Sequence, residues 1–147
     1  MIRIESYEPA FRDALTRVFK SNQPDYFLDQ ELPEFHKFLD DPHLTEHYDV
    51  IFYNDEIIGC GGIVLNENQT VSMCWGMVHA HFHKKGFGKF LLEHRLKKCH
   101  ELFPGKTVII RTTQHTWKFF EKYKFRLLFT KEDYWGPGMH LYHMERD

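Results

Sequence analysis

The chain has 147 residues, of which 42% are hydrophobic and 16% aromatic, and its formal net charge is -2. This length predicts one domain, spanning residues 1–147, with a core large enough to fold without disulfides or a structural metal. A net charge so close to zero gives no overall attraction to nucleic acid or to an anionic membrane, so neither is expected as a partner.

Cysteine usage and the N-terminal segment narrow the class of protein further. Cys60, Cys74 and Cys99 are scattered and form no Cys-x-x-Cys pair, so we expect neither a disulfide framework nor a zinc knuckle. The N-terminus lacks the apolar core of a signal peptide. No apolar run approaches the roughly 20 residues of a membrane span. We therefore expect a cytoplasmic protein.

The first third of the chain is predicted to form two helices. Apolar residues recur at helical spacing from Pro9 to Phe19, and the segment Ser21–Pro24 interrupts that pattern. Pro33 suits the first turn of a second helix, which must end before Pro42.

The pattern then changes to that of strands. Three extended runs separated by short turns predict an antiparallel meander: Tyr48–Tyr53, Ile57–Leu65 and Thr70–Val78. Within the third run, apolar residues occupy alternate positions, which predicts that they share one face of the sheet. These alternating residues are Val71, Met73, Trp75 and Met77.

A long helix is predicted from Gly86 to the stop at Pro104-Gly105. One face carries Leu91, Leu92, Leu96 and Cys99, and the charged side chains are expected to avoid it. Those charged residues are Glu93, Arg95, Lys97 and Lys98. The strand Thr107–Thr112 follows, so the chain should make a right-handed crossover between two parallel strands.

The C-terminal part is predicted to contain a short helix, Thr116–Tyr123, and two last strands, Phe125–Thr130 and Met139–Glu145. The segment Asp133–Gly138 is expected to join these two strands as a turn. Together the elements predict an α/β (α+β) fold with a mixed, mostly antiparallel central sheet flanked by helices.

The start of the long helix has an unusual composition, His83-Lys84-Lys85-Gly86-Phe87-Gly88-Lys89. A helix N-terminus already carries a partial positive charge and usually begins with a Ser, Thr or Asp cap. Here positive side chains surround it, and two glycines leave the backbone open. A bound anion would account for this pattern, although a solvated tight turn is compatible with it as well.

Two motifs together resemble those of a known family. The segment Val78–Leu92 resembles the acyl-CoA motif of the GNAT superfamily of N-acetyltransferases, a strand-ending valine followed by Arg/Gln-x-x-Gly-x-Gly/Ala and an apolar helix. Thr116–Phe125 resembles its second motif, often Ala-x-x-Phe-Tyr-Glu-Lys-x-Gly-Phe. The order of elements is similar along nearly the whole chain. The resemblance implies a GNAT-like fold and acetyl transfer from acetyl-CoA to a primary amine, without a metal.

The resemblance also implies where the donor binds. Pantetheine would pair with the backbone of Val78 and Ala80 as an added strand, and the N–H near Val78 would stabilise the oxyanion while the amine attacks directly. The implied cofactor contacts are Val78, His79, Ala80, His83, Lys84, Lys85, Gly86, Phe87, Gly88, Lys89, Thr116, Phe119 and Lys122.

Three positions depart from the family pattern. His83 replaces the usual Arg or Gln, Phe120 replaces the tyrosine that protonates the leaving thiolate, and Lys124 replaces a glycine. Tyr123, one helical turn from Phe120, is our candidate for the acid, with a packed aromatic residue as the alternative. The strand Thr70–Val78 carries no Asp or Glu, so it offers no obvious carboxylate base beside the thioester. The candidate bases are His79, His115 and Glu67.

Other functions remain open at this point. Phe120 is compatible with a non-catalytic CoA-binding or sensing module. The donor site implied by the resemblance could also take a longer acyl group. His79, His81 and His83 would share one face if the strand continued, and could then hold a metal. The acceptor could be a small amine, a peptide N-terminus or a protein lysine. An acidic Ser21–Pro33 loop favours a cationic amine. The oligomeric state is open, with a homodimer among the alternatives.

Overall fold

The structure, a computed structural model, describes all 147 residues. One seven-stranded sheet has the order β1-β2-β3-β4-β5-β7-β6. The strands are β1 (Ile2–Ser6), β2 (Tyr48–Tyr53), β3 (Glu56–Leu65), β4 (Val71–Val78), β5 (Val108–Thr112), β6 (Arg126–Gly136) and β7 (Met139–Arg146). The helices are α1 (Arg12–Ser21), α2 (Leu32–Leu39), α3 (Phe87–Leu102) and α4 (Trp117–Glu121). Only β4 and β5 pair in parallel, which confirms the predicted mixed, mostly antiparallel sheet.

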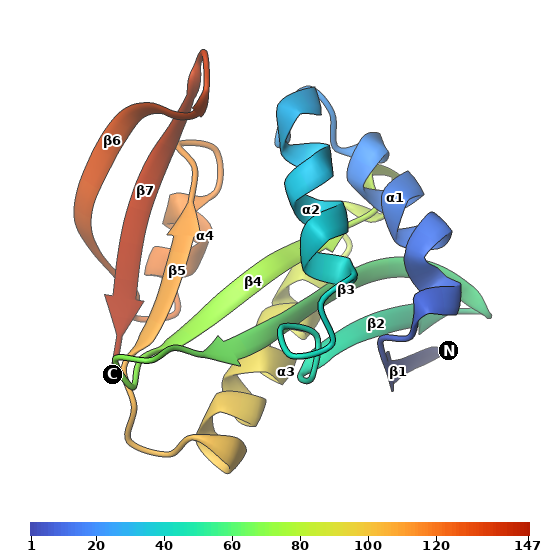
Figure 1. The fold of residues 1–147 in the computed structure, drawn as a ribbon, viewed down its shortest axis with the longest axis horizontal. Coiled ribbons are helices and arrows are strands. Elements are labelled where there is room, and N and C mark those ends of the chain that lie inside the picture. Colours follow the sequence, from blue (N-terminus) through green and yellow to red (C-terminus); the bar gives the residue numbers. More distant parts are fainter.

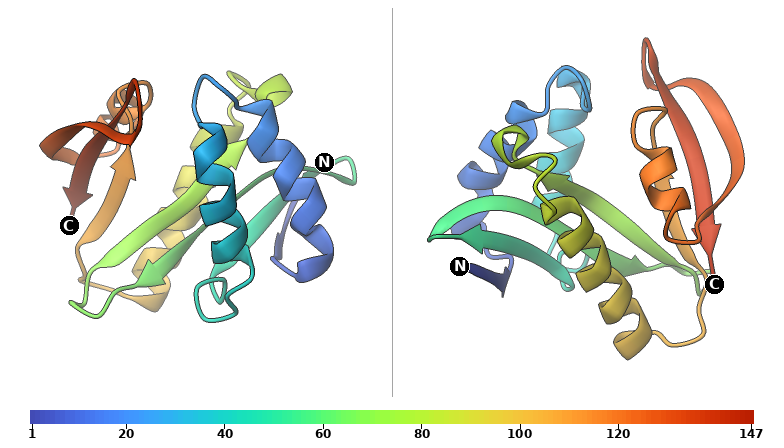
Figure 2. Two further views of the ribbon diagram at one scale, coloured as in Figure 1. Left: turned by 45° about the horizontal axis from the view of Figure 1, so that its top comes forward. Right: turned by 180° about the vertical axis from the view of Figure 1, so that it is seen from behind.

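The helices cover the two faces of the sheet in pairs. Helices α1 and α2 lie on one face, and α3 and α4 lie on the other (Figures 1 and 2). The core is divided accordingly. One apolar cluster joins α1 and α2 to β2, and another joins α3 and α4 to β4, β5 and β7. A ligand held within the sheet would therefore meet a different wall on each side.

Two strand predictions were wrong. Strand β1 was missed, because its short run alternates with charged residues at an edge of the sheet, where only one neighbour pairs with it. Strand β6 was predicted to end at Thr130 and instead reaches Gly136. Its pairing with β7 continues past an irregularity between Lys131 and Gly136, so most of the expected Asp133–Gly138 turn is strand.

The predicted alternation along β4 was also wrong. Val71 and Met73 pack in the cluster below α3 and α4, whereas Met77 packs toward α1 and α2. The register shifts between Cys60 and Gly62 on β3, opposite a β4 residue, Trp75, with a φ of 41°. This bulge rotates the rest of the strand. The buried hydroxyl of Tyr48 donates to the Trp75 carbonyl at 2.7 Å and so satisfies the distorted backbone.

The prediction that charged residues avoid the core face of α3 was wrong for Arg95, which is only 4% exposed. Gly61 on β3 and Gly76 on β4 make the space, because a Cβ at either position would press on the Arg95 side chain. Glycines on two neighbouring strands thus admit a charged residue that the helical pattern alone assigns to the surface.

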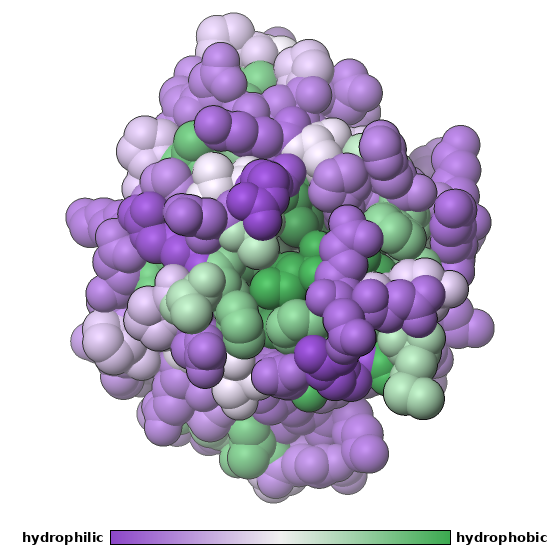
Figure 3. Space-filling model, turned by 90° about the vertical axis from the view of Figure 1, so that its right-hand side faces the viewer, coloured by the Kyte–Doolittle hydropathy of each residue, from purple (hydrophilic) through white to green (hydrophobic).

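One face of the surface is mixed in character. Figure 3 shows the side of the molecule that carries α1 and β1, where apolar side chains gather near the centre within a polar surround. None of the helices combines the length and the apolar character needed to cross a bilayer.

Candidate functional site

A wedge between β4 and β5 is the main opening in the sheet. The two strands pair only at Val71–Val108 and Ser72–Ile109 and then diverge, as Figure 1 shows. The gap holds a cavity of about 520 Å³ lined by both strands, by α3 and α4 and by the loop between α1 and α2. Where two neighbouring strands diverge, their backbone groups are free to bind an extended ligand.

The end of β4 presents a free amide to this wedge. The His79 N–H donates to Ile58 O at 2.7 Å, so the adjacent Gly59–Val78 pair is of the non-hydrogen-bonded kind. Both polar backbone groups of Val78 therefore face β5. Its carbonyl accepts from Asn22 Nδ2 at 3.0 Å and from His83 Nε2 at 2.8 Å. The Val78 N–H is left to bind a ligand.

This arrangement reduces the backbone pairing that the family resemblance implies. The Ala80 N–H donates to Ser21 Oγ at 3.0 Å, and the Val78 carbonyl already has two donors. The His83 ring, expected near phosphate, instead lies against Val78 O, and the His83 backbone N–H donates to Ala80 O at 3.2 Å. Of the Val78 and Ala80 backbone groups that were expected to pair with pantetheine, the Val78 N–H is thus the one that remains available.

The N-terminus of α3 is open in the way the sequence predicts. Gly86 precedes the helix with a φ of 88°, no side chain caps it, and no acidic residue lies in the first turn. The first intrahelical bond is Phe90 N–H to Gly86 O. A Cβ at Gly88 would meet nothing within 4 Å, so packing does not require glycine there. Free amides and open space beside them fit an anion.

The lysines around this helix end are exposed, and they differ in position. Lys84 has a φ of 60° and lines the wedge. Lys85 places its ammonium 5.7 Å from the ring centre of Phe82, and Lys89 lies in the first turn of the helix. All three charges therefore add to the positive end of α3.

Helix α4 forms the opposite wall. Thr116, Phe119 and Phe120 line the wedge, and Phe120 is buried. Lys122 lies outside it. Tyr123 also lines neither cavity described here, because its ring packs against Phe119 at 5.5 Å. It therefore has the position of a packed aromatic residue and not that of an acid at the wedge.

The turn after α4 keeps the backbone geometry of the glycine that it lacks. Lys124 has a φ of 72°, in the left-handed region that favours glycine. The turn therefore has the shape that a glycine would give it, although a side chain occupies a strained position.

Two of the three expected bases lie away from the wedge. Glu67 is exposed on the turn that precedes β4, at the far end of the strand from Val78. His79 caps a 3-10 turn, Ala80–Phe82, where its Nδ1 accepts from the His81 N–H at 3.2 Å. Burial, then the charge of His81, lowers the pKa of His79.

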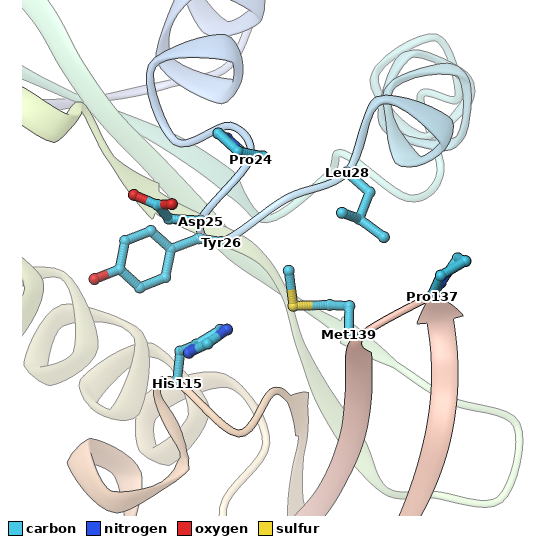
Figure 4. A pocket seen from close by; sticks show the side chains of 8 residues that line it. Pro24, Asp25, Tyr26, Leu28, His115, Pro137 and Met139 are labelled. Carbon is cyan, nitrogen blue, oxygen red and sulfur yellow. The ribbon is translucent and has the colours of Figure 1, made fainter.

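His115 lines a second cavity of about 440 Å³, next to the wedge. Figure 4 shows Tyr26 and Leu28 from the loop after α1, Pro137 and Met139 from the β6–β7 hairpin, and His115 below Tyr26. Tyr26 lines both cavities and meets the rings of His83 and His115 edge-on. The second cavity therefore lies next to the wedge, and Tyr26 lines both.

Glu31 is a site residue that the sequence did not single out as a base. It lies in a short 3-10 turn, Asp29–Glu31, lines the wedge and is 6% exposed. Burial raises its pKa, and the Leu28 N–H that it accepts at 2.9 Å opposes this only in part. A carboxylate with a raised pKa suits proton transfer near neutral pH.

The three clustered histidines do not share a strand face. Strand β4 ends at Val78, and His83 turns back to the Val78 carbonyl. No group of three His, Cys, Asp or Glu side chains lies close enough together to hold a metal.

Comparison with known proteins agrees with this geometry. A model of the Acetyltransferase (GNAT) family matches residues 9–125. No curated protein sequence matches the chain significantly. Among solved structures, Ard1 from Thermoplasma volcanium is 17% identical with a TM-score of 0.79, covering 99% of this chain and 96% of that one. The ribosomal-protein-S18-alanine N-acetyltransferase from Escherichia coli is 13% identical with a TM-score of 0.79, covering 99% and 92%.

Arabidopsis thaliana Naa50, solved with the bisubstrate analogue CoA-Ac-MVNAL, is 17% identical with a TM-score of 0.75, covering 99% of this chain and 98% of that one. These likenesses establish the fold, and the family model spans most of the chain. The chain therefore belongs to the GNAT family of acetyltransferases.

Proposed function

We propose that residues 1–147 act as one domain that transfers an acetyl group from acetyl-CoA to a primary amine. The observation that carries this proposal is the wedge, which opens where β4 leaves β5 and leads to the uncapped N-terminus of α3. An extended thioester substrate with an anionic end fits such an opening, because its two ends require different surroundings.

The donor would lie with its pyrophosphate at the amides of Phe87, Gly88 and Lys89, beside the ammonium groups of Lys84 and Lys85. Its pantetheine arm would then enter the wedge along Thr116 and Phe119. The thioester carbonyl would accept the Val78 N–H, which points into the gap and stabilises the charge that develops on oxygen.

The acceptor amine would approach from the α1 and α2 side, where Tyr26 and Glu31 line the wedge. Glu31 would take the proton of the attacking amine, directly or through water. Asp25 borders the neighbouring cavity and favours a cationic acceptor. The peptide analogue bound to Naa50 and the aminoglycoside 6'-N-acetyltransferase that shares this fold support testing both peptide and small amines.

The experiment is a transfer assay across a panel of peptide N-termini, lysine peptides, polyamines and aminoglycosides, corrected for acetyl-CoA hydrolysis. We expect transfer to at least one class of amine. Binding of acetyl-CoA without transfer to any amine would instead support a CoA-binding module, an alternative that the missing hydroxyl at Phe120 favours.

A double variant tests the anion site. Lys85→Ala/Lys89→Ala should weaken acetyl-CoA binding about tenfold, since each lost charge near a phosphate removes a fraction of a kcal/mol to about 1 kcal/mol. The matched control is Lys37→Ala/Lys97→Ala, which removes two exposed charges away from the wedge. Equal affinity of the two double variants, measured by calorimetry, would refute the placement of the pyrophosphate.

A further inference from the structure

Arg95 is a buried cation without a counter-charge. It is 4% exposed, and its Nε has no hydrogen-bond partner. The ionisable groups that act on it are the thiols of Cys74, Cys99 and Cys60 and the phenol of Tyr48, none of which is a carboxylate. An isolated buried charge is strongly unfavourable in an apo protein. Its presence in α3 therefore points to an anion that Arg95 meets in the functional cycle.

The guanidinium lies at the wedge. Arg95 lines the cavity, and a Cβ at Gly76 would lie 2.5 Å from its Nη2, so its tip rests against the backbone of β4. Gly76 is only two residues before Val78, on the part of β4 that has left β5. Arg95 is also two helical turns beyond the α3 N-terminus, or about 12 Å along the axis. It is thus deeper in the wedge than the proposed pyrophosphate site.

The face of the sheet on which Arg95 lies indicates which anion it would bind. Arg95 comes from α3, on the same face as α4 and Phe120, whereas Glu31 comes from the opposite side. The proposed donor runs along Thr116 and Phe119, so the sulfur of the thioester enters the wedge from the α4 side and departs on that side. An amine that attacks from the Glu31 side therefore expels the leaving group toward Arg95 and Phe120, where no side chain can protonate it.

We propose that Arg95 is a catalytic residue whose guanidinium hydrogen-bonds to the thiolate of coenzyme A as it leaves; this rests on the proposed function. The amine nitrogen forms the C–N bond, the C–S bond breaks, and its electron pair stays on sulfur. The amine proton passes to Glu31 and then to water, so the immediate products are amide, thiolate and a proton. Arg95 stabilises the thiolate by charge and remains protonated itself.

The other charged groups do not replace Arg95. Lys84 and His83 line the wedge at its entrance, and Arg111 is exposed on β5, with its guanidinium 4.9 Å from the ring centre of Tyr134. Tyr48 from β2 and the thiols around Arg95 are neutral; Tyr48, Cys60 and Cys99 are buried and Cys74 is half-buried. Burial raises the pKa of Cys60 and Cys74 to about 12 and that of Cys99 to about 11.

The test is a pH titration of the thiol of protein-bound CoA by its thiolate ultraviolet absorbance, with desulfo-CoA as the blank. Burial raises the pKa of the protein thiols to about 11 or about 12, above the range in which the bound CoA thiol is expected to ionise, and the desulfo-CoA blank subtracts their absorbance. In the wild type we expect the bound thiol to ionise about one pH unit or more below free CoA, because a nearby cation favours the thiolate. Arg95→Met should abolish this difference, and Arg95→Lys should retain part of it.

Kinetics provide the second readout. Arg95→Met should lower kcat about 100-fold, as loss of a charge-stabilising donor does in other enzymes, with little change in the KM for acetyl-CoA. The variant should fold with a Tm no lower than that of the wild type, since it removes an unpaired buried charge.

Three outcomes would overturn the role of Arg95. The first is a bound thiol that ionises identically in wild type and Arg95→Met, and the second is an unchanged kcat in that variant. The third is a preference for succinyl-CoA over butyryl-CoA that disappears in Arg95→Met, which would assign the guanidinium to an acyl carboxylate. Failure of the wild type to bind any CoA would refute the proposed function itself, a result distinct from these three.

Discussion

The chemistry of the wedge depends on single side chains, namely those of Glu31, Phe120 and Arg95. Each lines the same wedge, yet Glu31 becomes a better base, Phe120 cannot donate a proton and Arg95 has no partner. The glycines and lysines at the start of α3 could be predicted from the sequence, because a helix end is local. The burial of Glu31 and Arg95 could not, because it depends on residues far along the chain; Gly61 and Gly76, for example, make room for Arg95.

Replacing Glu31 tests the proposed base. Glu31→Gln should lower kcat about 100-fold, the usual contribution of a positioned base. Because burial raises the pKa of Glu31, wild-type kcat should rise with pH through a value above that of an ordinary glutamate, and the variant should lack this rise.

The stability of this variant follows from the same shift. A raised carboxyl pKa stabilises the fold only at low pH, and that contribution is lost as pH rises through the folded-state pKa. Glu31→Gln should therefore be at least as stable as the wild type at neutral pH, which separates loss of activity from loss of fold. The control is Glu34→Gln, an exposed acidic residue on α2. A similar loss of kcat in that control would contradict the assignment.

At the scale of elements, the fit of α3 against β3 and β4 determines what the wedge contains. The periodic patterns predicted nearly every helix and strand, since periodicity reflects which face is buried. They failed along β4 because the bulge at Trp75 changes the face of the following residues, and no local pattern announces a bulge. They failed on α3 because Gly61 and Gly76 belong to other elements.

Gly76→Ala tests this fit. The new methyl group must displace the enclosed guanidinium of Arg95, so we expect a loss of about 1–3 kcal/mol in the free energy of unfolding. In an Arg95→Ala background the same change should be nearly neutral, giving a coupling of about 1 kcal/mol or more. Denaturant unfolding of the four proteins measures this coupling. Additive effects would show that Arg95 does not occupy the space beside Gly76.

At the scale of the whole molecule, the site is a consequence of topology. Strands β1 to β4 form one antiparallel unit and β5, β7 and β6 form another, and the strands of the two units pair only at two residue pairs of β4 and β5. The crossover through α3 places its open N-terminus at the mouth of the gap between them (Figure 2). In the proposed function, donor binding, amine access and thiolate release would thereby take separate sides of one wedge.

The proposed function requires acetyl-CoA to bind in this wedge with its phosphates at α3. The most direct measurement is an NMR titration of isotope-labelled protein with acetyl-CoA, followed at the backbone amides. We predict the largest shift changes at Phe87, Gly88 and Lys89 and at the Val78 amide inside the wedge. Binding that leaves the shifts of these four amides unchanged, or no binding at all, would contradict this placement of acetyl-CoA.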